Sequence, residues 1–141
     1  MAITAIEDFI STLAAISISG VKRQYGSPPK KLAAADLPAS YPRAPQSEEF
    51  SITGSDHGGW PKMTAELVLV YEAVNLDTPD ANFKGALAAW AIMSTAFRNL
   101  PLGLNTGSLG KSKLDVEMRQ DVTTIGGIAY WAVTATVTGY G

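Results

Sequence analysis

The sequence predicts an α+β fold, in which an antiparallel sheet of about four strands is packed by an N-terminal helix and one long central helix. Two segments repeat apolar residues at the spacing of a helix, and four segments are typical of strands. Their order is helix, irregular arm, two strands, helix, two strands, which places helices on one face of an antiparallel sheet. A length of 141 residues indicates a single domain, residues 1–141.

The first helix is predicted over residues 2–18. Its apolar stripe repeats at spacings of three and four: Ile3, Ile6, Ile10 and Leu13. Thr4 and Glu7 have the spacing of a capping box, in which each side chain bonds the other residue's backbone amide. Gly20 is a plausible stop for this helix.

Residues 20–47 form an irregular, proline-rich arm. Five of the eight prolines of the chain lie here, and proline has no amide hydrogen to donate, which excludes a regular helix or a central strand. Residues 32–37 have room for one or two helical turns. The arm is also basic, because a single acid, Asp36, opposes five cations: Lys22, Arg23, Lys30, Lys31 and Arg43. We interpret it as an arm that packs over its own domain or over a neighbour.

Two strands are expected next, over residues 48–53 and 64–74. The second, TAELVLVYEAV, is apolar on both faces in its middle and is therefore placed at the centre of the sheet. The glycine-rich segment between them, residues 54–61, is predicted to be a loop.

The central helix is predicted over residues 79–99. Thr78 is suited to the N-cap, Pro79 to the first helical position, and Pro101 ends the pattern. One stripe gathers the larger side chains and is expected to pack: Phe83, Leu87, Trp90, Ala91, Ser94 and Phe97. A loop, residues 102–110, follows this helix.

The last two strands, residues 114–122 and 128–137, should form a hairpin around a turn at 123–127. The first of them alternates strictly. We expect its charged side chains to point to solvent: Asp115, Glu117, Arg119 and Asp121.

Composition limits the function classes. Hydrophobic residues make up 46% of the chain and charged residues 17%, and a formal net charge of −2 does not favour nucleic-acid binding by bulk charge. The absence of cysteine excludes disulfides and thiolate metal sites. The N-terminal segment has no basic stretch typical of a signal peptide, and no apolar run is long enough to span a membrane, so we expect a protein of the cell interior or of a particle assembled there.

Gly110, Lys111 and Ser112 could be the end of a phosphate-binding loop. That loop needs a strand before it, a helix after it, and a glycine where this chain has Asn105. Here a helix precedes the segment and a strand follows, so no helix N-terminus faces a phosphate. We therefore interpret residues 103–112 as a glycine-rich connection without a bound nucleotide.

The remaining polar residues do not form a recognisable catalytic or metal-binding pattern. His57 is the sole histidine and lies among glycines, which is typical of an exposed loop. A carboxylate pair for glycoside hydrolysis needs only a separation in space, and the sequence leaves that alternative open. We expect no enzymatic activity, no cofactor and no metal.

The order and texture of the segments resemble the small tail terminator proteins of long-tailed bacteriophages, the minor tail protein U group. The resemblance rests on the helix, on the arm SPPKKLAAADLPASYPRAP, on the strand TAELVLVYEAV, on the helix TPDANFKGALAAWAIMSTAFRNL and on the final Tyr-Trp strand. It covers most of the chain without a diagnostic motif.

The resemblance implies a non-enzymatic virion protein of the tail-neck region, assembled in the host cytoplasm. Its subunits would form a ring, expected to be a hexamer, that caps the tail tube and ends tail polymerisation. Its partners would be further copies of itself, the tail tube protein and the head completion or stopper protein, with DNA passing through the lumen as cargo and no membrane involved. The alternatives are another neck or tail component, such as a head-closure or tail-tube protein, and a small-ligand or nucleotide-binding module.

The arm and the 103–112 loop are the expected contact or lumen elements. The candidate contact residues are all basic: Lys22, Arg23, Lys30, Lys31, Arg43, Lys111 and Lys113.

Overall fold

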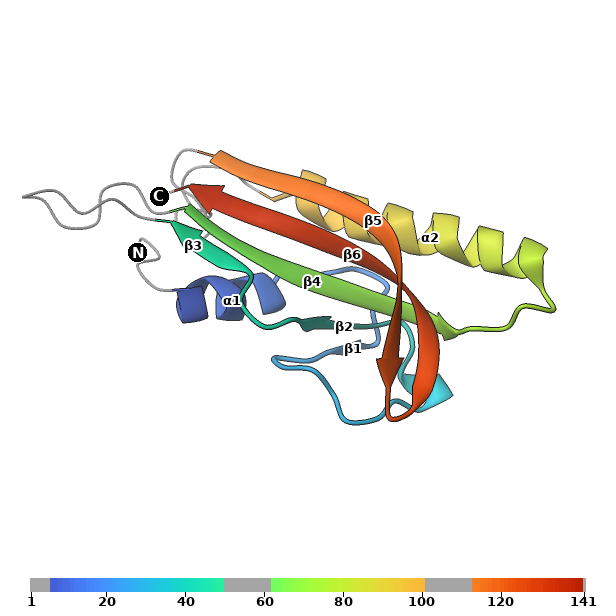
Figure 1. Cartoon of the computed structure of the whole chain (residues 1–141). Coiled ribbons are helices and arrows are strands. Elements are labelled where there is room, and N and C mark those ends of the chain that lie inside the picture. Colours follow the sequence, from blue (N-terminus) through green and yellow to red (C-terminus); the bar gives the residue numbers. More distant parts are fainter. Residues whose placement is uncertain (1–5, 50–61, 101–112, 141) are drawn as a thin grey trace, which may run out of the picture.

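The computed structural model describes residues 6–49, 62–100 and 113–140 (Figure 1). It contains two α-helices, one short 3-10 helix and six strands within these ranges. In chain order they are α1 (Ile6–Ala14), β1 (Arg23–Gln24), η1 (Ala34–Asp36), β2 (Ala39–Pro42), β3 (Ser47–Glu49), β4 (Lys62–Ala73), α2 (Pro79–Arg98), β5 (Lys113–Ile125) and β6 (Ile128–Tyr140).

The six strands form one mixed sheet in the order β1-β2-β4-β6-β5, with β3 paired to β4 beside β2. Every pairing is antiparallel except that of β1 with β2, which is parallel. The α+β class is confirmed, and the predicted antiparallel sheet of about four strands is confirmed in part: the sheet is mostly antiparallel, but it is mixed and has six strands. The two extra strands, β1 and β2, come from the arm, where two and four residues are too short to show alternation.

Three long strands, β4, β6 and β5, form the frame of the sheet. β5 runs to Ile125, three residues further than predicted, because the turn is confined to Gly126 and Gly127. Both glycines have positive φ, +60° and +81°, as a two-residue type I′ turn requires. β5 lies at the edge of the sheet, so one side of its backbone has no partner strand among the described residues.

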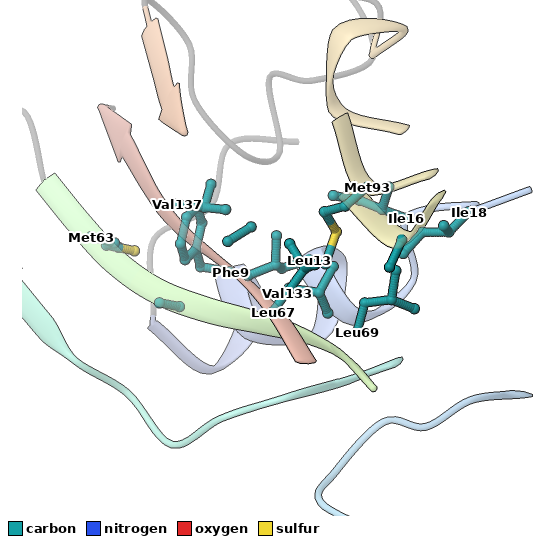
Figure 2. Close-up of a cluster of buried hydrophobic side chains, with 13 residues drawn as sticks. Phe9, Leu13, Ile16, Ile18, Met63, Leu67, Leu69, Met93, Val133 and Val137 are labelled. Carbon is teal, nitrogen blue, oxygen red and sulfur yellow. The ribbon is translucent and has the colours of Figure 1, made fainter. Parts of the chain in front are cut away.

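Both helices cover one face of the sheet, and the main core lies between the helices and that face (Figure 2). Phe9 and Leu13 of α1 and Met93 of α2 are fully buried there. They meet alternate residues of two central strands: Met63, Ala65, Leu67 and Leu69 of β4, and Val133, Ala135 and Val137 of β6.

The arm covers part of the opposite face and forms a second core. β2 is buried along its whole length, and the Tyr130 hydroxyl donates to the Leu32 carbonyl over 3.3 Å. The cluster also includes Tyr41, Val68, Val70 and Ile125. The arm therefore packs over its own domain, which was one of the two expected arrangements.

The first helix is shorter than predicted at its C-terminal end. α1 ends at Ala14, and Ile16 and Ile18 reach the core from the segment that follows, where they are still buried. Thr4, the expected cap, lies outside the described residues. Neither helix within the described ranges is long and apolar enough to cross a membrane.

The second helix begins at Pro79 as predicted, but Thr78 makes no capping hydrogen bond to it. Asn82 Nδ2 instead donates to the Asn75 carbonyl over 2.6 Å and ties the first turn to the preceding loop. Gly85 faces the sheet, where an added Cβ would lie 2.9 Å from Glu72 Oε1. Small residues therefore set how closely α2 approaches β4.

Candidate functional site

The predicted contact residues do not form one cluster. Lys22, Lys30 and Lys31 are exposed on the arm. Arg23 Nε lies 3.4 Å from Asp36 Oδ1, and this guanidinium is 65% exposed. Lys111 lies outside the described residues, as do His57 and the whole 103–112 loop. Lys113 is the first residue of β5, and its side chain is not described.

Arg43 is the exception, because it is not free for a partner. It follows β2 and reaches across the arm-covered face of the sheet, where its two terminal nitrogens contact Glu66 at 3.3 Å and Asp121 at 3.1 Å. Arg119 of β5 contacts the same Glu66 at 2.6 Å. The expectation that Arg119 and Asp121 point freely to solvent is therefore wrong, because Arg43 and Glu66 draw both of them into an ionic cluster.

Threonines of β6 complete this ionic cluster of Arg43, Glu66, Arg119 and Asp121. Thr134 Oγ1 donates to Asp121 over 3.1 Å, and Thr136 Oγ1 donates to Glu66 over 3.2 Å. The cluster thus joins β4, β6 and β5 to the residue after β2.

The electrostatics of the cluster favour its charged form. Burial alone would raise the pKa of Glu66, but hydrogen bonds from Arg119 and Arg43, together with their charges, outweigh it and lower that pKa. Burial likewise opposes a lowered pKa at Asp121, where the Val122 amide, Arg43 and Thr134 stabilise the carboxylate. Burial would lower the pKa of Arg43, and its two carboxylate partners raise it instead. Two cations and two anions balance, so the cluster serves to hold strands together and offers no surplus charge to a ligand.

One residue of the ionic cluster, Glu66, stands out in the sequence. Glu66 is a charged residue in the middle of the most apolar strand, where a carboxylate is stable only with a partner. The partner could not be identified from one sequence, because the pairing depends on the register of β4, β6 and β5.

Among the described residues, three large apolar side chains are exposed along α2. Phe83, Leu87 and Trp90 are 65%, 56% and 40% exposed, although the stripe containing them was expected to pack. The buried residues of the helix are Ala89 and Met93. They project about 100° round the helix axis from the three exposed side chains. The predicted packing of the stripe is therefore wrong over its N-terminal half. We call Phe83, Leu87 and Trp90 the α2 flank.

The α2 flank takes no part in the groove that α2 forms with the segment after α1. That groove has a volume of about 540 Å³. It is lined by Ser17 and Ser19 of the segment after α1, and by residues at the C-terminal end of α2 and directly after it: Ala91, Ile92, Thr95, Ala96, Asn99 and Leu100. Phe97 continues the flank toward the C-terminus, where it packs on the same core as Leu114 and Met118 of β5. Val116 and Val122, on the face of β5 turned toward the helices, are also exposed, at 37% and 47%. Two exposed apolar side chains thus lie on the edge strand of the sheet.

The chemistry of the described residues shows no other candidate centre. Among residues 6–49, 62–100 and 113–140, no group of three or more histidine and carboxylate side chains is placed to hold a metal ion. No known protein family and no curated protein matches the chain.

Proposed function

We propose that the protein is a structural subunit that assembles as a ring, caps the tail tube of a long-tailed bacteriophage and forms its head-tail joining surface. The observation that carries the proposal is the exposed α2 flank, with Phe83, Leu87 and Trp90 65%, 56% and 40% exposed. Soluble monomers seldom leave several large apolar side chains exposed on one helix side, and such surfaces are typical of protein contacts.

The resemblance in order and texture to tail terminator proteins supports the same class. A ring needs two different surfaces on each subunit, because a heterologous contact joins the front of one copy to the back of the next. The arm on one face of the sheet and the α2 flank on the other supply two such surfaces. In this proposal the protein has no catalytic role, and the ionic cluster keeps the sheet rigid between the two contact surfaces.

A tube-capping assay tests the proposal. The full chain is added to a phage tail tube protein while the tubes polymerise, and tube lengths and ends are recorded by electron microscopy. We expect elongation to stop and a ring to be visible at one tube end. Tubes that elongate equally with and without the protein, and whose ends stay bare, would contradict the proposal.

The same assay separates the alternative stations in the tail. A tail-tube protein would itself extend the tubes, and a head-closure protein would leave tube length unchanged while binding to an already capped end. Either result would replace the terminator assignment with that component.

A further inference from the structure

The charge of the chain is unevenly divided. Five basic residues and one acid give residues 20–47 a net charge of +4, and because the whole chain carries −2, the other residues carry −6. Opposite charges on two different surfaces make a molecule complementary to a second copy of itself placed head to tail.

The exposed cations of the arm are its lysines. Arg43 is balanced inside the ionic cluster, and Arg23 contacts Asp36. Lys30 and Lys31 are exposed, and within the described residues neither makes an ion pair. They follow Pro28, which is exposed, and Pro29, which is half-buried. The arm therefore presents a stiff proline pair that leads directly into two positive charges.

The α2 flank has the matching chemistry. Phe83 and Trp90 offer exposed aromatic faces, with Leu87 between them. Asp80 precedes Phe83 by almost one turn and is exposed in the first turn of α2, and the exposed Lys84 follows Asp80 by about one turn. Exposed aromatic side chains can accept proline rings, and the Asp80 carboxylate can accept a lysine.

Within one copy these two surfaces cannot meet. α2 lies on the face of the sheet that carries the main core, whereas the arm packs on Val68, Val70 and Tyr130 of the opposite face. In Figure 1 the part of the arm around β1 and β2 lies at one edge of the sheet, and α2 lies toward β5 at the other edge. A contact between them therefore joins two copies.

We infer that residues 28–31 of one copy dock on the α2 flank of the next copy, with the prolines against Phe83 and Trp90 and the lysines beside Asp80. The contact is heterologous, so each copy uses its arm on one side and its flank on the other. The inference rests on the proposed function, because these contacts close on themselves only if the copies form a ring. It adds to that proposal the two surfaces that touch.

Cross-linking between two single-cysteine variants tests the contact. The natural chain has no cysteine, so Ser27→Cys and Leu87→Cys each introduce the sole thiol of their copy. Mixed and mildly oxidised, they should yield a disulfide-linked pair of the two variants. The matched control replaces Leu87→Cys by Ala88→Cys, since Ala88 is the exposed neighbour that projects about 100° away from the flank.

We expect a yield of the mixed pair about tenfold above the control, the effect of one well-packed contact. Lys30→Glu with Lys31→Glu in the arm copy should reduce the yield, and Asp80→Lys in the flank copy should restore it. A mixed pair no more abundant than the control, or a yield that ignores these charge changes, would overturn the inference.

This readout is independent of the tube-capping assay. If the protein caps tubes but gives no mixed pair, the proposed function is supported and the inferred contact is wrong. If it gives the mixed pair but does not cap tubes, the contact is supported and the terminator role is wrong.

Discussion

At Glu66, one carboxylate accepts hydrogen bonds from two guanidinium groups and from the Thr136 hydroxyl. Its side chain is 9% exposed, so water does little to screen these interactions. Removing Glu66 leaves two partly exposed guanidinium groups without one of their carboxylate partners, which costs more than the net value of the bonds themselves.

Glu66→Gln should therefore lower the free energy of unfolding by about 1–3 kcal/mol, because it leaves Arg43 and Arg119 facing a neutral amide. The measurement is urea denaturation followed by circular dichroism. The matched control is Glu49→Gln, whose contact with Lys62 lies at the surface and should be worth less than about 1 kcal/mol. Equal losses in both variants would contradict a special role for the cluster.

The same carboxylates predict a pH dependence. The pKa values of Glu66 and Asp121 are lowered in the folded protein from their ordinary values of 4.5 and 3.8. The unfolded chain therefore binds protons first as the pH falls, and stability that is complete above the unfolded values is lost as the pH drops through the folded values. The free energy of unfolding should be flat above about pH 5.5 and decline below that value, with a shallower decline in Glu66→Gln. An equal acid slope in both proteins would argue against this assignment.

At the scale of elements, the turn between β5 and β6 offers a matched pair of positions. Gly126 and Gly127 both have positive φ, but an added Cβ at Gly126 would lie 3.0 Å from the Lys30 carbonyl oxygen, whereas at Gly127 no atom lies within 4 Å. The hairpin tip thus supports the arm through a close backbone approach.

Gly127→Ala should cost about 1–2 kcal/mol, the price of a left-handed backbone for a residue with a Cβ. Gly126→Ala should cost more than that, because it must also displace the Lys30 backbone. Thermal unfolding of the two variants measures the difference. A melting temperature for Gly126→Ala equal to or above that of Gly127→Ala would show that the arm does not press on the turn.

The two sides of α2 predict two kinds of mutant. Met93 is fully buried, and Met93→Ala should destabilise the fold by about 2–5 kcal/mol. Leu87 is 56% exposed, and Leu87→Ala should leave the stability of a dilute monomer nearly unchanged, within about 0.5 kcal/mol. Urea denaturation at low protein concentration distinguishes them, and a large loss for Leu87→Ala would mean that the α2 flank is part of the core.

The sequence predicts both α-helices, the helical turn of the arm and the strands outside the arm, but not the two short strands β1 and β2. β4, β5, β6 and α2 each extend over twelve or more residues, enough for a period of two or 3.6 to be recognised. β2 has four residues, one of them proline, and it forms because β4 offers a partner edge. On α2, periodicity identified an apolar stripe but not its environment, since the sheet is approached through Gly85 and Ala89, whose small side chains carry little hydrophobic signal.

The candidate site was predictable from the sequence where it depends on local composition, but not where it depends on contacts between distant residues. The basic residues of the arm were visible as a charge bias, and most of them are exposed on the described surface. Arg43 was assigned to that surface as well, but its place in the ionic cluster depends on carboxylates 23 and 78 residues away in the chain. The exposed α2 flank emerged only with the three-dimensional placement of the helix.

At the scale of the whole molecule, a rigid sheet carries a basic arm on one face and an apolar, acid-bordered helix flank on the other. Identical subunits with two different contact surfaces form closed rings when each contact turns by a fixed fraction of a circle, and open filaments otherwise. The ionic cluster and the arm core hold the two surfaces in a fixed relation, which is what closure requires.

Ring formation is tested by the native mass of the full chain in the presence of tail tubes, after the capped ends are released. We expect one discrete closed species, a hexamer by the resemblance to tail terminators, which Leu87→Asp abolishes while the monomer stays folded. A protein that remains monomeric on the tubes, or a ring that forms unchanged with Leu87→Asp, would contradict this expectation.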